Sequence, residues 1–122
     1  MGSSTPAECP TCSGTDFLMA TLPGDISHSL DGGSGVVFAE CEGCGDDISF
    51  DIVAERSRDA ATETVTEEVT CPDCWANSVL SVELSTDALI QLPEGYLVLN
   101  VECLDCGFAY TVETVVSGVR AP

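Results

Sequence analysis

The eight cysteines of this chain constrain its fold more than any other sequence feature. They form four Cys-x-x-Cys pairs, at Cys9/Cys12, Cys41/Cys44, Cys71/Cys74 and Cys103/Cys106. Adding 62 to each of the first four positions gives the last four. This spacing indicates that one cysteine-bearing unit occurs twice in the chain.

The repeat extends beyond the cysteines and needs no gap. At the same offset of 62, matching residues include Leu18/Leu80, Leu30/Leu92, Gly33/Gly95 and Val53/Val115. We therefore predict two units, at 1–54 and 70–122, joined by a linker at 55–69 that adds a strand at its end. The polar linker leads us to expect two semi-independent cores, and the second unit should end in a mobile tail from Ser117.

Each unit has the pattern of a small all-β fold. Ile48, Phe50 and Ile52 alternate with polar residues, which is typical of a half-buried strand. The residue pattern predicts three strands in each unit, at 17–22, 36–40 and 47–53 in the first and at 79–84, 96–102 and 108–115 in the second. The connection after the first strand is too glycine-rich for a helix in the first unit, whereas TDALIQL in the second could form a helical turn. We expect each unit to be a three-stranded antiparallel sheet with two cysteine turns, called knuckles below, at one end.

The cysteine pairs have the spacing of metal ligands. Zn²⁺ takes four thiolates in a tetrahedron at about 2.3 Å, and two Cys-x-x-Cys turns held by a hairpin supply them. A unit of about 46 residues buries too little apolar surface to fold alone, whereas a structural zinc can contribute about 10–16 kcal/mol. The 28 residues between the paired turns recur in both units, which favours two local sites. The predicted ligands of two zinc ions, one per unit, are Cys9, Cys12, Cys41 and Cys44, and Cys71, Cys74, Cys103 and Cys106.

The order of these motifs resembles the zinc ribbon family, in which a Cys-Pro-x-Cys turn, a hairpin, a Cys-x-x-Cys-Gly turn and a final strand follow one another. The resemblance covers both units and implies a tandem zinc ribbon. Ser13 and Trp75 stand where the family usually has a glycine after the first knuckle. The acidic, cysteine-rich composition also resembles small ribbon proteins of haloarchaea and their tailed viruses.

Other uses of the cysteines are weaker interpretations. Disulfides are disfavoured because Met1–Pro10 has no features of a secretory signal and the Cys-x-x-Cys pairs recur. A redox motif normally occurs once, beside a βαβ pattern that the sequence lacks. Iron in a rubredoxin-like site is the alternative metal, since thiolates accept iron as well as zinc. The aromatic core typical of rubredoxins is missing.

The charge of the chain is strongly one-sided, with 21 Asp+Glu against three arginines, no lysine and a net charge of −18. Such a surface repels phosphate, so nucleic-acid binding is an alternative that is not favoured. Halophilic adaptation would explain the same composition, because salt at ~1 M shortens the Debye length to about 3 Å. No apolar run reaches the ~18 residues of a spanning helix, so we expect no membrane association and no secretion, with the protein in the cytoplasm or in a virion.

The sequence offers little for catalysis. His28 is the single histidine and lies in a polar loop, and four cysteines would close each metal site. We therefore expect no enzyme and no small-molecule substrate. The predicted function is a zinc-binding protein–protein interaction or assembly module, a structural subunit of a larger complex or virion. The alternatives are a nucleic-acid-binding ribbon and an iron electron carrier.

Aromatic residues gather in the second unit. Trp75, Tyr96 and Phe108 are the candidate interaction residues, since aromatic side chains dominate interface anchors. The alternative is that they fill the core.

Overall fold

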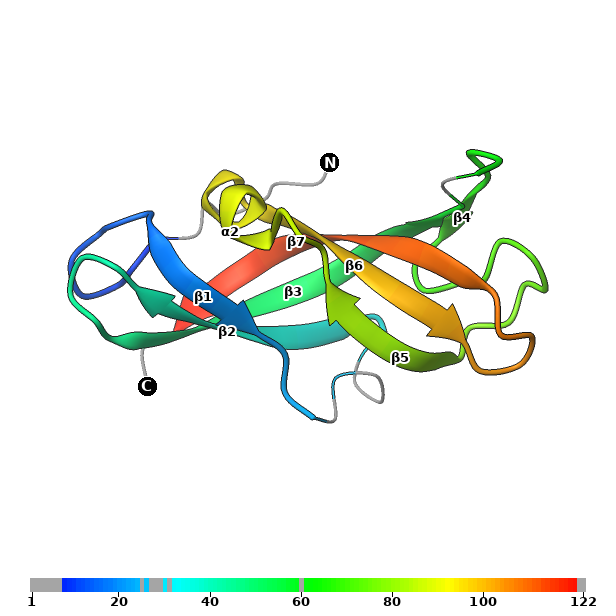
Figure 1. The fold of residues 1–122 in the computed structure, drawn as a ribbon, viewed down its shortest axis with the longest axis horizontal. Coiled ribbons are helices and arrows are strands. Elements are labelled where there is room, and N and C mark those ends of the chain that lie inside the picture. The colour runs from blue at the N-terminus through cyan, green and yellow to red at the C-terminus, as the bar shows by residue number, and fades with distance from the viewer. Residues whose placement is uncertain (1–7, 25, 27–29, 31, 60, 121–122) are drawn as a thin grey trace.

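One antiparallel sheet of seven strands dominates the computed structural model, which describes residues 8–24, 26, 30, 32–59 and 61–120 (Figure 1). The strands are β1 Phe17–Thr21, β2 Ser34–Cys41, β3 Asp47–Arg58, β4 Val65–Glu67, β5 Val79–Leu84, β6 Tyr96–Cys103 and β7 Ala109–Arg120. A short helix, α2 Ala88–Gln91, and a 3₁₀ turn, η1 Leu92–Glu94, lie between β5 and β6. The predicted small all-β fold is confirmed.

The repeat seen in the sequence is also a repeat of structure. β2 begins at Ser34 and β6 at Tyr96, and β3 begins at Asp47 and β7 at Ala109, each pair 62 residues apart. Each unit thus contributes its three predicted strands. The strand order is β1-β2-β3-β7-β6-β5, so the two three-stranded sheets are joined edge to edge through β3 and β7.

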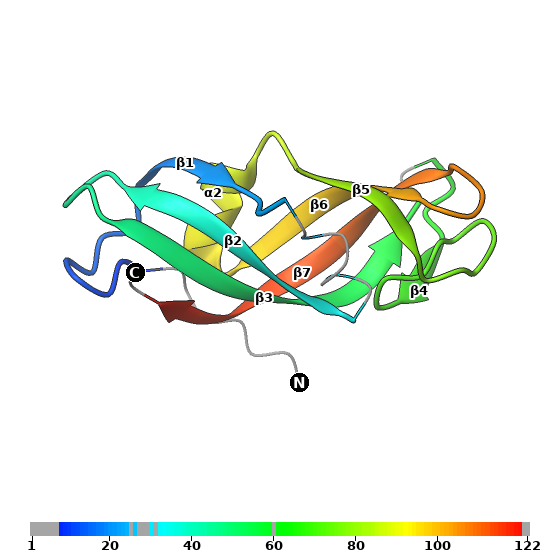
Figure 2. The ribbon, with the colours of Figure 1, turned by 90° about the horizontal axis from the view of Figure 1, so that it is seen from below.

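The register of this junction is symmetric. Val53 lies opposite Val115, which is its own equivalent in the other unit. Ser49 lies opposite Arg120 and Arg58 opposite Thr111, and these two pairings exchange under the 62-residue offset. The units are therefore related by an approximate two-fold axis between Val53 and Val115. Figure 2 shows β3 and β7 side by side across the middle of the molecule.

The segment 55–69 is more ordered than a linker. β3 runs on to Arg58, beyond its predicted end at Val53, and β4 pairs with this extension. β4 is the added strand expected at the end of the segment. Ser57 holds it in place, because its hydroxyl donates to the carbonyl of Glu68 at 2.6 Å and accepts the N–H of Thr70 at 3.0 Å.

The prediction of a mobile tail is wrong for residues 117–120. Ser117 to Arg120 form the end of β7, because β7 runs on alongside the first residues of β3 and pairs with Ser49, Phe50 and Asp51. Arg120 also forms an ion pair with Asp51 at 2.6 Å. Residues 121 and 122 lie outside the described part of the chain.

The buried faces of the two units form one apolar core. Ile48, Phe50 and Ile52 are buried as their alternation predicts, and Leu97 and Leu99 of β6 belong to the same cluster. Phe50 meets Phe17 edge to face, with ring centroids 5.2 Å apart. The expectation of two semi-independent cores is therefore wrong, since the paired central strands leave no polar layer between the units.

The connections after β1 and β5 share two equivalent buried positions among the described residues. In the second unit Ala88 and Leu92 point into the core, and in the first their equivalents Ile26 and Leu30 are buried and helical. The expectation that glycine keeps the first connection from being helical is therefore wrong at Ile26 and Leu30. The glycines flank these helical residues, and Gly33 follows them with a φ of 89°. The helix α2 lies against β1, a strand of the other unit.

A core substitution should therefore weaken both units together. Phe50→Ala removes a fully buried side chain, which typically costs about 3–5 kcal/mol of unfolding free energy. We expect the amides of β2 and β6 to lose protection from hydrogen exchange in parallel, as measured by NMR. Loss of protection in β2 alone would show that the units are separate cooperative blocks.

Candidate metal centres

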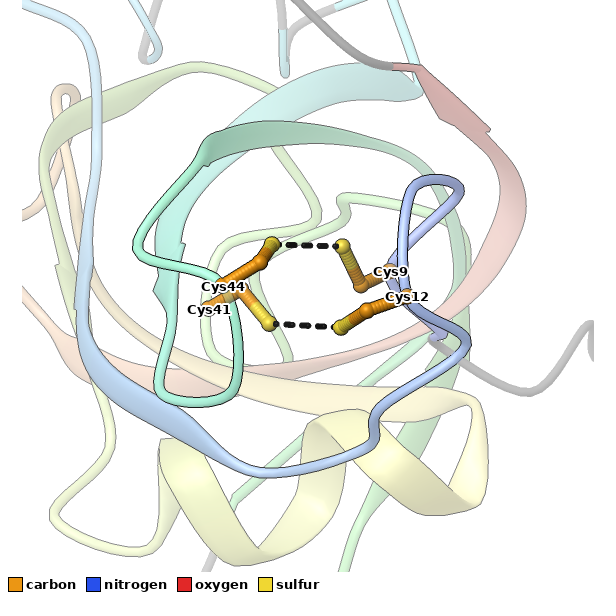
Figure 3. Close-up of side chains that lie close together, drawn as sticks. All are labelled: Cys9, Cys12, Cys41 and Cys44. Atoms are coloured by element: carbon orange, nitrogen blue, oxygen red, sulfur yellow. Dashed lines mark hydrogen bonds between the residues drawn. The ribbon is translucent and has the colours of Figure 1, made fainter.

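The eight cysteines form two groups at opposite ends of the sheet. In each unit the second strand ends at one knuckle, and the chain before the first strand forms the other (Figure 1). The first group brings together the side chains of Cys9, Cys12, Cys41 and Cys44, whose sulfur atoms face one another (Figure 3). The second group consists of Cys71, Cys74, Cys103 and Cys106. The groups are the two sets predicted from the spacing.

The distances between sulfurs fit a tetrahedral metal site. Within each group all four sulfurs lie within 4.8 Å of one another. The closest contacts join opposite knuckles: Cys9 to Cys44 at 3.5 Å and Cys12 to Cys41 at 3.5 Å. The second unit repeats them at 3.6 and 3.5 Å. A metal with four bonds of about 2.3 Å separates its sulfurs by about 3.8 Å, whereas a disulfide needs about 2.05 Å. Each group can therefore hold one metal ion.

Tight turns position the sulfurs. In the first knuckle, the N–H of Ser13 donates to the carbonyl of Cys9 at 2.8 Å, and Trp75 donates to Cys71 at 2.9 Å. The second knuckle closes in the same way through Gly45 in the first unit. These turns require a left-handed residue after the second cysteine. Ser13 and Trp75 adopt it at φ 61° and 65°, so the absence of glycine leaves the knuckle geometry intact.

Each knuckle has a buried and an exposed cysteine. The first of each pair, such as Cys9 or Cys41, belongs to the apolar core, and the second, such as Cys12 or Cys44, is exposed to solvent. A metal ion in the group would thus link the core to the knuckle surface. This placement suits a structural role, since the ion would hold two loops and the end of the sheet together.

The grouped thiols oppose one another's ionisation, and a bound cation would stabilise their ionised form. Burial acts to raise the pKa of Cys9, but hydrogen bonds from the backbone of Cys12 and Thr11 lower it to about 6. The N–H of Asp46 acts to lower the pKa of Cys44, yet desolvation and the neighbouring thiols raise it to about 12. Desolvation and neighbouring thiols likewise raise the pKa of Cys106 to about 12, against the lowering effect of the Phe108 N–H. Four thiolates thus need a bound cation to coexist.

The candidate interaction residues do not form one cluster. Trp75 is 68% exposed beside the second cysteine group, so the core-filling alternative does not apply to it. Phe108 is half-buried and stacks on Tyr110 with ring centroids 6.4 Å apart. Tyr96 is exposed but stands at the start of β6, seven residues from Cys103 and about 23 Å away along the strand. Its pKa is raised by a hydrogen bond with Glu94.

Sequence reasoning missed the role of the arginines. Arg120 pairs with Asp51 at 2.6 Å, and its equivalent Arg58 pairs with Glu113 at 3.2 Å. Arg56 joins Glu113 at 3.3 Å. All three arginines therefore form ion pairs across the junction of β3 with β7. The matching offsets of Arg58/Arg120 and Asp51/Glu113 in the sequence could have indicated these pairs.

Comparison with protein-family models, curated proteins and solved structures finds no match to this chain. None of the helices in the described residues has the length and apolar character needed to cross a membrane. His28, expected in an exposed loop, lies outside the described residues. The cysteine geometry is consequently the observation on which a function can be built.

Metal content gives a direct test of the two groups. The reduced, purified chain should contain two metal ions, measured by native mass spectrometry. Cys41→Ser should lower the content to one, because serine is a poor ligand for a soft thiolate-binding metal. Cys103→Ser should do the same at the other group. A chain that keeps two ions after either substitution would contradict the assignment of ligands.

Metal binding should strengthen as the pH rises. When the ion leaves, thiols with raised pKa values, such as Cys44 and Cys106, take up protons that a returning ion must displace. We expect the logarithm of the affinity to rise by about two or more per pH unit between about pH 5 and pH 7, measured by competition with a chromogenic chelator. An affinity that is independent of pH in this range would rule out thiolate ligation.

Proposed function

We propose that this protein is a non-catalytic, zinc-binding module for protein–protein interaction or assembly. The observation that carries the proposal is the presence of two complete four-cysteine groups, one at each end of a single sheet. Metal at both ends would stiffen a small β platform whose outer face and knuckles stay available for partners. The tandem zinc ribbon resemblance supports the same assignment.

Zinc is the proposed metal in both groups. Zinc prefers tetrahedral thiolate sites that are closed by four protein ligands, which matches the donor set of each group. Iron in a rubredoxin-like site has the same ligands and is the competing assignment. The two are separated by colour and elemental analysis, since an iron–tetrathiolate protein is red and its zinc form is colourless.

The donor sets also argue against catalysis at the metal. A catalytic zinc keeps one position for water or substrate, whereas four sulfurs occupy all positions of a tetrahedral ion. We infer a structural subunit or adaptor, in the cytoplasm or in a virion, rather than an enzyme.

Proteins are favoured over nucleic acids as partners. All three arginines already pair with Asp51 or Glu113, so no cluster of unpaired basic side chains is left for a phosphate backbone. Near the second metal group, in contrast, Trp75 and Leu104 are 68% and 57% exposed. Their equivalents in the first unit are Ser13 and Glu42. We propose that the Trp75 end of the molecule contacts a protein partner.

The single tryptophan provides the test. Trp75 should emit at long wavelength and be readily quenched by iodide in the isolated chain, because its ring is exposed. Proteins captured by the wild-type chain should be lost with Trp75→Ser, which copies Ser13 of the first unit, at a cost of about 2 kcal/mol or more in binding. Each captured protein, once purified, should shift the emission of Trp75 to shorter wavelength.

The matched control is Ile90→Ser, which removes another exposed apolar side chain of the same unit, 71% accessible, and should leave capture unchanged. Blue-shifted, protected emission in the isolated chain would contradict the proposed contact. Equal loss of capture with both variants would do the same.

A further inference from the structure

A groove crosses the outer face of the first unit, on β1, β2 and β3. Two rows of paired residues form it: Met19, Glu40 and Asp47 in one, and Thr21, Phe38 and Ser49 in the other. Met19 and Phe38 are 53% and 42% exposed there. Their side chains therefore expose apolar surface to solvent inside the groove.

The second unit has the same groove with different chemistry. Its equivalent rows consist of Ser81, Glu102 and Ala109, and of Glu83, Asn100 and Thr111. Asp59 and Ala61 from the turn after β3 also line this second groove. Ser81 and Asn100 occupy the positions that are equivalent to Met19 and Phe38. The fold therefore does not require an apolar residue at these two positions. Val101, Phe108 and Tyr110 give the second groove an apolar lining of its own, so the exposed pair Met19 and Phe38 is what distinguishes the first groove.

The first groove also has an unusual pair of charges. Glu40 and Asp47 lie directly opposite each other on β2 and β3, where two like charges destabilise the sheet. In the second unit Glu102 faces Ala109, so this direct opposition is absent. A cation placed beside Glu40 and Asp47 would relieve the repulsion.

We propose that this groove binds a protein segment that carries an apolar side chain next to a lysine or arginine. The inference rests on the proposed interaction function and deepens it by naming a surface and the chemistry of its partner. The apolar side chain would lie against Phe38 and Met19, and the cation would lie between Glu40 and Asp47. This groove is distinct from the Trp75 end.

Charge complementarity excludes a second copy of this chain as the occupant. The chain has a net charge of −18, and its three arginines are engaged in ion pairs at the junction of the units. Within the described part of the chain, a second copy has no unpaired arginine to offer Glu40 and Asp47, and its net charge would repel the first molecule. A partner with basic side chains would supply the cation and would be attracted to the negatively charged chain.

Peptide selection tests the proposal on the full, metal-loaded chain. A displayed library of random peptides is selected on the wild-type protein and, in parallel, on the double variant Met19→Ser, Phe38→Asn, which copies Ser81 and Asn100. Retained metal and an unchanged amide spectrum establish that the variant is folded. Selected peptides are then titrated while the methyl signal of Met19 is followed by NMR at low and high salt.

We expect groove-dependent peptides to pair an apolar residue with lysine or arginine, to shift the Met19 signal, and to bind the double variant at least about tenfold more weakly. Their affinity should fall with salt, because part of the attraction is between charges. Installing the groove in the second unit with Ser81→Met, Asn100→Phe and Ala109→Asp, which restores the opposed carboxylates, should add a second site.

Several results would overturn the proposal. The selection could yield no peptide whose binding depends on the groove. The groove-dependent peptides could be neutral or acidic. The chain could also associate with itself in a way that Phe38→Asn abolishes. Each leaves the Trp75 contact open to its own fluorescence test, so failure of the groove and failure of the proposed function are distinguishable.

Discussion

The gathering of four thiols at each end of the sheet is the constraint on which the rest of this structure depends. The sulfurs stand 3.5–3.6 Å from their nearest partners on the opposite knuckle, close enough for each ionised thiolate to oppose the ionisation of the next. A divalent cation reverses this, since it turns mutual repulsion into four bonds. The buried cysteines belong to the apolar core, so a bound ion would also fix where the core ends.

The second organising feature is the junction of β3 with β7. Neither unit alone encloses a complete core, because the helical segment of the second unit lies against β1 of the first. Because the register is symmetric about Val53 and Val115, each half of the junction repeats the contacts of the other half. The ion pairs on either side of the axis are therefore equivalent. These pairs are exposed, and such pairs contribute about 0–1 kcal/mol each. Their main effect is to neutralise the few positive charges of the chain within the molecule.

Much of the architecture could be predicted from the sequence, because each strand and each knuckle is indicated independently in both copies of the repeat. The ligands followed from spacing alone, and the alternation of Ile48, Phe50 and Ile52 located the buried face of β3. The edge-to-edge union of the units could not be predicted, since local composition says nothing about which strand edges pair. For the same reason the polar residues at 55–58 and 117–120 resembled a linker and a tail, although each set completes a central strand.

The proposed contact surfaces were harder to predict because they depend on which face of a strand a side chain occupies. Trp75 was a candidate because of its residue type. Its exposure could not be predicted, because it depends on the left-handed conformation of the knuckle turn. Phe38 and Met19 passed unnoticed among apolar residues of ordinary strands. Comparison of the units position by position would have indicated them, since Asn100 and Ser81 occupy the equivalent places. On the function proposed here, the differences between the copies determine what each surface binds, and their similarities determine the fold.

X-ray absorption at the metal edge tests the central claim most directly, because it reports the number and kind of ligand atoms around each ion. Four sulfur neighbours at about 2.3 Å are expected for both ions, with no nitrogen or oxygen ligand. A spectrum with three sulfurs and one lighter atom would contradict the claim. Such a site would be open to water, and the protein would then need a chemical function rather than a structural one.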